Sequence, residues 1–257
     1  MEHHEQIPIL IGKGARIVDR GTFIVFIALV IWLLIDTSKR RELSISALCT
    51  IAGLSIFWQE FYADWGVYLL WSNSFKLMPW GSTLWTTPNK PWFVIVAYPL
   101  FMCFSIGTML ALCRKVLAKR PNNNRFLICL LTAGICLIAI NTLIEYFAVS
   151  GFGVWGYVSA IGPALETGHA LQPLLYPNIP FGIWGAVICF LILSQSANGR
   201  PKFESITKPD NFSAGWQRET ARAIAWIFVW NVSYWLILCT PLIITRELLG
   251  RHNALVP

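Results

Sequence analysis

The sequence predicts an all-α protein, a polytopic transmembrane bundle of six helices, or seven if residues 150–180 contain another span. Of 257 residues, 56% are hydrophobic and 13% are charged, and the mean hydropathy is +0.57. Such values are typical of integral membrane proteins and exclude an ordinary soluble domain. The length leaves room for a single bundle, one domain over 1–257, and for no sizeable soluble domain.

Six apolar runs predict the spans in chain order, at 20–36, 43–72, 92–113, 126–149, 181–195 and 221–245. The first run follows a polar tail and ends at Lys39-Arg40-Arg41, not at a small-residue cleavage site. It is therefore expected to be a retained span and not a signal peptide. Residues 150–180 are rich in glycine and proline, which disfavours a plain helix. We expect an irregular extramembrane or re-entrant loop there, which is a candidate lid or site wall.

The positive charges alternate between the two ends of the expected spans. Connections 37–42, 114–125 and 196–222 carry three, five and five Lys or Arg residues, more than the other tails and loops together. The positive-inside rule places these connections in the cytoplasm and both termini outside. The net charge of +7 is thereby explained by topology, so we expect no nucleic-acid partner. The seven Cys lie in apolar segments without C-x-x-C spacing, which predicts small buried side chains and no metal site.

The most informative segment is 58–66, in the second expected span. Glu60 and Asp64 are four residues apart, so a helix places both on one face. A carboxylate at membrane depth costs about 2.5–3.5 kcal/mol on insertion scales unless it faces a protein interior or water. The pair therefore predicts a polar pocket inside the bundle, although hydrogen-bonded contacts between helices are an alternative. Aromatic side chains that would line this pocket are Trp58, Tyr62, Trp65 and Trp71.

Other polar residues are expected at the same depth, near the outer leaflet. Asn141 and Glu145 are one turn apart at the outer end of the fourth span, and Glu166 and His169 follow in the next loop. Each also has a structural interpretation: a packing contact for Asn141, snorkelling for Glu145, and a solvated or capping role for His169. The expected catalytic residues are Glu60, Asp64, Glu145 and His169. The expected substrate-binding residues are Trp58, Tyr62, Trp65, Trp71, Asn141, Glu166 and Asn231, the last with a polar contact between helices as its alternative.

Two neighbouring carboxyl groups in a low-dielectric site have different pKa values, because both cannot easily be ionised at once. One is therefore expected to hold its proton while the other stays ionised. The protonated carboxyl group would serve as a general acid, and the faces of aromatic rings would stabilise a developing cation. This chemistry suits acid-triggered cyclisation of a lipophilic substrate. The sequence has no D-D-x-x-D, H-E-x-x-H or G-x-S-x-G motif and no P-loop, so neither a metal nor a cofactor is expected. The nine remaining acidic residues lie in tails, loops or helix ends, where their charge needs no special explanation.

Several elements follow one another in a distinctive order: Asp64, Trp71-Ser72-Asn73-Ser74, the Trp-rich loop to Pro88, Tyr98-Pro99, Glu145, Gly153 to Tyr157, Gly168 to Leu174, and Arg218 to Ala225 followed by Asn231. In this order of elements the chain resembles the avermectin spirocyclase-like family of bacterial integral membrane proteins. The resemblance implies a multi-pass enzyme of secondary metabolism in the bacterial inner membrane. It would turn a dihydroxy-ketone polyketide into a spiroketal by dehydrative cyclisation, without a cofactor.

Two other functions fit the same residues. A membrane terpene or meroterpenoid cyclase would protonate an epoxide or alkene with an intramembrane carboxylic acid, but an acid would also be expected in the last span, and 221–245 has none. A lipid-binding or transport protein would catalyse no reaction. A transporter would be expected to show internal repeats or an acid-lined path across the membrane, but the two halves of the chain are not similar and the acids gather at one depth. The expected partners are membrane lipids and a lipophilic polyketide or terpenoid.

Overall fold

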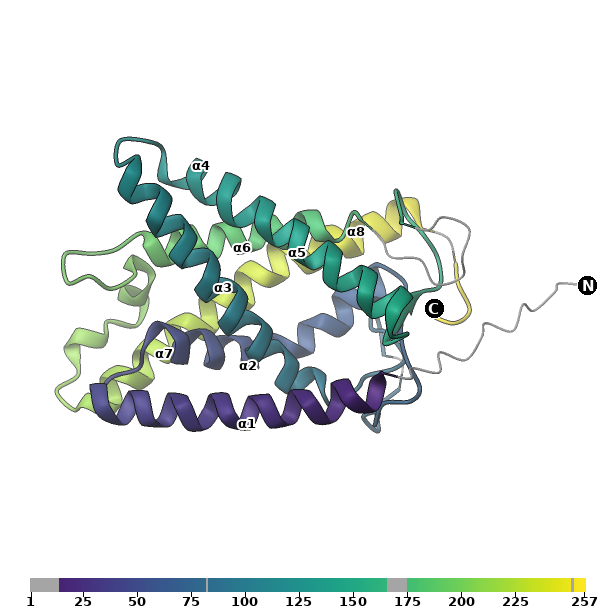
Figure 1. The fold of residues 1–257 in the computed structure, drawn as a ribbon, viewed down its shortest axis with the longest axis horizontal. Helices are drawn as coiled ribbons and strands as arrows, with labels where there is room; N and C mark the ends of the chain where they lie inside the picture. Colours follow the sequence, from purple (N-terminus) through teal and green to yellow (C-terminus); the bar gives the residue numbers. More distant parts are fainter. Residues whose placement is uncertain (1–13, 82, 166–174, 251) are drawn as a thin grey trace, which may run out of the picture.

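The computed structural model describes residues 14–81, 83–165, 175–250 and 252–257, and the chain in it is predominantly helical (Figure 1). The α-helices are α1 (Ala15–Arg40), α2 (Ile45–Gly66), α3 (Val94–Lys119), α4 (Arg125–Cys129), α5 (Ile135–Tyr146), α6 (Asn178–Leu193), α7 (Gly215–Tyr234) and α8 (Thr240–Leu249). Shorter helices are the π-helical turns η1 (Leu130–Gly134), η2 (Phe147–Gly151) and η5 (Trp235–Cys239) and the 3-10 turns η3 (Lys202–Thr207) and η4 (Pro209–Asn211). The strands are β1 (Leu69–Trp71) and β2 (Trp155–Tyr157).

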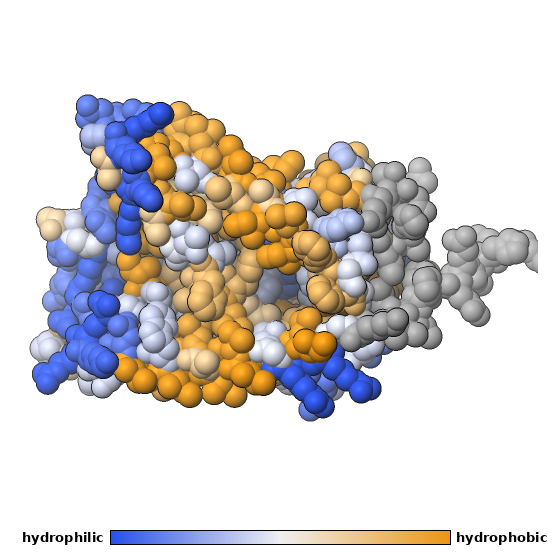
Figure 2. Space-filling view, viewed as in Figure 1, coloured by the Kyte–Doolittle hydropathy of each residue, from blue (hydrophilic) through white to orange (hydrophobic). Residues whose placement is uncertain are grey.

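Four helical segments are long and apolar enough to cross a membrane: Ala15–Arg40, Val94–Lys119, Arg125–Gly151 and Gly215–Leu249. The membrane character of the chain is thus supported, while six spans stay a prediction. Helix α6 has 16 residues, about 24 Å, which is less than the roughly 30 Å of bilayer hydrocarbon. Helix α2 is long enough, but Gln59, Glu60 and Asp64 make it more polar. Figure 2 shows an apolar band beside a hydrophilic end.

The expected second helix is too long at its C-terminal end. Helix α2 ends at Gly66, not at residue 72, and Trp71 belongs to a strand. A Cβ on Gly66 would lie 2.9 Å from the carbonyl carbon of Leu242, so this end of α2 is pressed directly against α8. Tyr68 then adopts φ 60°, a left-handed conformation that cannot continue an α-helix.

The strands form a two-stranded antiparallel sheet that the all-α prediction did not include. Leu69 pairs with Tyr157, and Trp71 pairs with Trp155. The sheet joins the connection after α2 to the segment 150–180, which the sequence predicts to be irregular. It lies at the end of the bundle where α2 ends and α3 begins (Figure 1).

A buried ion network at the opposite end ties η3 to α7. The guanidinium of Arg222 lies 2.8 Å from Glu204 and 2.6 Å from Glu219, and its Nη1 also donates to the carbonyl of Leu43. The indole Nε1 of Trp226 donates to Glu204 at 2.7 Å. Glu204, one of the nine acidic residues without a role predicted from the sequence, therefore has a structural one, because its paired side chain is only 2% exposed. Arg222 is the buried basic partner of these acids.

Close contact between α6 and the η1–α5 segment depends on a glycine. A Cβ at Gly182 would come 2.5 Å from Ile138 Cγ1 and 2.7 Å from the carbonyl oxygen of Gly134. We expect Gly182→Ala to lower the free energy of unfolding by about 1–3 kcal/mol through overpacking. Thermal unfolding in detergent, followed by circular dichroism, measures the loss.

The matched control is Gly107→Ala in α3, where an added Cβ meets nothing within 4 Å. This change is expected to be neutral or to stabilise by up to about 1 kcal/mol, because alanine favours helix more than glycine does. Equal midpoints for the two variants would contradict the close contact at Gly182.

Candidate functional site

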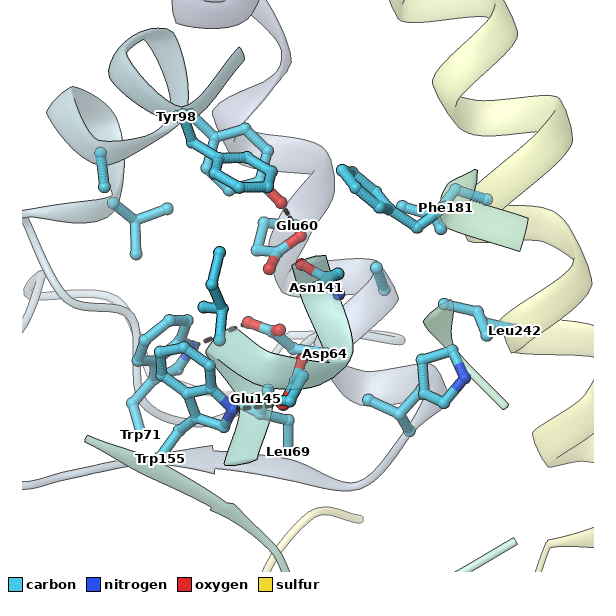
Figure 3. A pocket seen from close by; sticks show the side chains of 18 of the residues that line it. Glu60, Asp64, Leu69, Trp71, Tyr98, Asn141, Glu145, Trp155, Phe181 and Leu242 are labelled. Carbon is cyan, nitrogen blue, oxygen red and sulfur yellow. Dashed lines mark hydrogen bonds between the residues drawn. The ribbon is translucent and has the colours of Figure 1, made fainter. Parts of the chain in front are cut away.

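A cavity of about 230 Å³ lies within the bundle at the end covered by the sheet (Figure 3). It has many times the roughly 10–15 Å³ that one water molecule occupies by this measure. Helices α2, α3 and α5 and both strands supply most of its wall. The polar lining residues are Glu60, Asp64, Tyr98, Asn141, Glu145, Trp155, Tyr157, Trp71 and Tyr234, and the rest are mainly aliphatic side chains and phenylalanines.

The small sheet places indole donors on two of the carboxyl groups. Trp71 Nε1 donates to Asp64 Oδ2 at 2.8 Å, and Trp155 Nε1 donates to Glu145 Oε2 at 2.9 Å. The two tryptophans are paired across the sheet, with ring centroids 5.0 Å apart. Alternate residues of a strand share a face, so Tyr157 lies beside Trp155 and donates to the same Glu145 oxygen at 2.6 Å. Burial raises the pKa of Tyr157 well above its ordinary value and nearby Glu145 raises it further, so the phenol remains a donor.

Tyrosines from two other helices hold the third carboxyl group. Tyr234 of α7 donates to Glu60 Oε2 at 3.0 Å, and Tyr98 of α3 donates to the same oxygen. The two hydroxyls are 2.7 Å apart. Asp64 lies one helical turn beyond Glu60 on α2, so the site is a row of acids with an aromatic donor on each. These donors reach only one oxygen of each carboxyl group.

The three carboxyl groups of the site are close enough to interact electrostatically, and no lysine or arginine is among the described residues that line the cavity. Glu60 and Glu145 both interact electrostatically with Asp64. Lys90, in the loop before α3, is close enough for its charge to interact with Asp64. Burial lowers the pKa of Lys90, and the charge of Asp64 opposes this shift. Its ammonium donates to the carbonyls of Gly81 and Thr87, so Lys90 is a structural cation beside the site.

The structure brings together five of the eleven predicted site residues. Those that line the cavity are Glu60, Asp64, Trp71, Asn141 and Glu145. Asn141 also donates to Asn178 Oδ1 at 2.5 Å, which joins α5 to α6. Glu166 and His169 fall outside the described residues.

Four predicted residues lie away from the cavity. Trp58 is 43% exposed and stacks on Trp235, and Tyr62 packs edge-on against both rings. Their helix face is turned away from that of Glu60 and Asp64, so neither side chain lines this cavity. Trp65 donates to the carbonyl of Pro257. Asn231 is held by Ser55 and Gln59, which fits its alternative role as a contact between helices.

Apart from Trp71, the donors to the carboxyl groups were not predicted as site residues. Tyr98 and Tyr234 are easily taken for aromatic belt residues because they lie in apolar runs. Trp155 and Tyr157 show a weak signal, the alternation of aromatic residues in a glycine-rich loop. Nothing in the sequence pairs that segment with residues 69–71. Among the described residues, no three His, Cys, Asp or Glu side chains form a group that could hold a metal ion.

Removal of one indole donor should weaken the fold measurably. Trp71→Phe deletes the N–H that donates to Asp64, whose side chain is buried. We expect a loss of about 1–3 kcal/mol of stability, because the buried acceptor loses its partner. The midpoint of thermal unfolding in detergent measures it, with Trp80→Phe, at an exposed position in the connection between β1 and α3, as the control. An equal shift for both variants would show that the indole bond is dispensable.

The fold and the cavity together define a helical membrane protein with an acidic, aromatic-walled internal site. No protein-family model, curated protein or solved structure matches the chain.

Proposed function

We propose that the chain is a multi-pass integral membrane cyclase that closes rings in a lipophilic substrate by acid/base chemistry, of the spiroketal-forming type and without a cofactor. One observation carries the proposal: three carboxyl groups, each bonded to an aromatic donor, face one cavity in a membrane bundle. Intramembrane acids that face a bundle interior are usually functional. The polyketide class and a bacterial inner-membrane location rest on the resemblance of the sequence.

The proposed reaction needs one proton donor and one acceptor. Addition of the first hydroxyl of a dihydroxy-ketone to its carbonyl gives a hemiketal. A protonated carboxyl group then transfers its proton to the hemiketal hydroxyl, which leaves as water, and an oxocarbenium ion forms. The second hydroxyl attacks this cation and gives up its proton to a neighbouring carboxylate. The net change is the loss of one water molecule, so the enzyme requires no oxidant or metal.

The positions of the three acids suit these roles. Glu60 and Asp64 lie one turn apart on α2, so a proton donor and an acceptor are available on the same side of a bound ketone. The cavity walls from Trp71, Phe93 and Trp155 present aromatic rings, which stabilise a developing cation and limit access of water. Glu145, across the cavity on α5, is a second acceptor. Six spans are part of the proposal, since α2 and α6 contribute to the same cavity as three of the four longer segments, those at Val94–Lys119, Arg125–Gly151 and Gly215–Leu249.

Metabolite profiling of the native host tests this function. A deletion strain and the same strain complemented with the wild-type gene are compared by mass spectrometry. We expect the deletion strain to accumulate a precursor that is heavier than the product by one water molecule. A precursor of the same mass as the product, with one ring fewer, would instead indicate isomerising cyclisation of the terpenoid type. Identical profiles would contradict a cyclase and favour a lipid-binding or transport role.

A further inference from the structure

A second hollow, which we call the α1–α3–α5 groove, lies beside the acidic cavity. Its volume is about 470 Å³, and its wall comes from α1, α3 and α5. Leu100, Phe104 and Met109 of α3 and Ile140 of α5 give it an apolar lining, and Ser105 and Thr108 are among its few polar residues. No acidic or basic side chain lines it among the described residues.

The groove and the cavity share a wall. Ala97, Phe101 and Ile144 line both spaces, so only the thickness of these side chains separates them. The residues next in sequence belong to the acidic site: Tyr98 donates to Glu60, and Glu145 follows Ile144. Phe101 packs against Phe181 of α6, with ring centroids 5.6 Å apart. The apolar and acidic spaces thus meet at one junction.

The far side of the groove faces the membrane. Phe104 is 58% exposed and Val25 is 48% exposed. Both lie on helices long and apolar enough to span a bilayer, so their exposed surfaces contact lipid and not water. Figure 2 shows a recess with paler, more polar atoms at its floor in the otherwise apolar surface of this face.

We infer that the substrate is an amphiphile that enters sideways from the bilayer, with its hydrocarbon chain in the α1–α3–α5 groove and its oxygenated end at Glu60 and Asp64. This inference rests on the proposed function and adds the substrate class and its route. The continuity of an apolar groove with an acidic cavity matches a molecule that has one apolar and one polar part. Because the groove already lies in hydrocarbon, a chain can enter it without crossing water. Phe101 and Ala97 then form the junction through which the polar end passes.

Photolabelling in lipid nanodiscs tests the route without requiring turnover. The probe is a long-chain hydroxyketone with a diazirine near the far end of its chain, and labelled peptides are mapped by mass spectrometry. We expect labelling on α3 around Phe104 that excess unlabelled hydroxyketone suppresses and excess phospholipid does not. Ala97→Trp fills the junction and should reduce this competable labelling roughly tenfold. Thr108→Trp, at an exposed groove position that disturbs the fold little, should also reduce it.

The control is Leu112→Trp, an exposed position on α3 outside both spaces, which should leave labelling unchanged. Labelling that phospholipid suppresses equally well would show an ordinary lipid in the groove and overturn the inference. Uniform labelling of all exposed helices, or full labelling in both groove variants, would overturn it too. Failure of the proposed function is seen separately, as normal metabolite profiles in the deletion strain, since probe labelling needs no reaction.

Discussion

Asp64→Asn is expected to lower the rate of product formation by about 10²–10⁴-fold, the usual contribution of a general acid or base. Asparagine keeps the size of the side chain and still accepts from Trp71, but it neither donates an acidic proton nor becomes a carboxylate. Glu60→Gln should have an effect of the same order, because the two acids are proposed to act as donor and acceptor. The ratio of precursor to product in complemented deletion strains measures both effects.

The matched control for this prediction is Asp36→Asn. Asp36 is also an acid on a membrane helix, but it is paired with Arg40 at the polar end of α1, away from the cavity. Its replacement should leave the ratio of precursor to product unchanged. The amount of each variant in isolated membranes must match that of the wild type. Full activity in both Asp64→Asn and Glu60→Gln would refute the carboxyl-pair mechanism, even if the deletion strain accumulates precursor.

The second large effect is expected at the buried ion network. Arg222→Ala should lower stability by about 3–5 kcal/mol, because it leaves the buried carboxylate of Glu204 without its ion-pair partner. The same change removes the bond to the carbonyl of Leu43, which holds the turn between α1 and α2 against α7. The thermal midpoint in detergent should fall markedly, and less protein should reach the membrane.

Arg218→Ala is the control for the ion network. Arg218 is one turn earlier on α7 and also approaches Glu219, but its side chain is 34% exposed and the contact is 3.4 Å. A partly exposed pair of this kind contributes at most about 1 kcal/mol. If the two variants unfold at the same temperature, the network is not a major source of stability. Neither arginine lines the cavity, so residual folded protein should keep the proposed activity.

The helices themselves could be predicted closely from the sequence. Long apolar runs with basic ends locate α1, α3 and the segment from Arg125 to Gly151 to within about six residues at each end, since a membrane span needs a minimum number of apolar residues. The end of α2 differs from its expected position because of a tertiary contact. Gly66 ends α2 because α8 lies against it, and a hydropathy pattern contains no information about α8.

The acids of the site could also be predicted, since charged residues in an apolar run are rare and costly. Apart from Trp71, the donors to these acids could not be predicted. Tyr98 and Tyr234 reach the site because of the way α3 and α7 are rotated about their axes. Trp155 and Tyr157 reach it because β2 pairs with β1, which lies more than eighty residues earlier in the chain. Trp58 and Tyr62 are near Glu60 in sequence, yet the helical repeat turns them to the opposite face.

By itself, then, the sequence determined that the chain is a helical membrane protein and that Glu60, Asp64 and Glu145 are its unusual residues, because hydropathy and the cost of an intramembrane charge are local properties. The tertiary structure decided that these three acids share one cavity, which aromatic donors bind each of them, and that an apolar groove adjoins them. It also decided that Glu204 is buried and paired. These are properties of packing between distant segments, which helix rotation and strand register fix only when the whole chain is assembled.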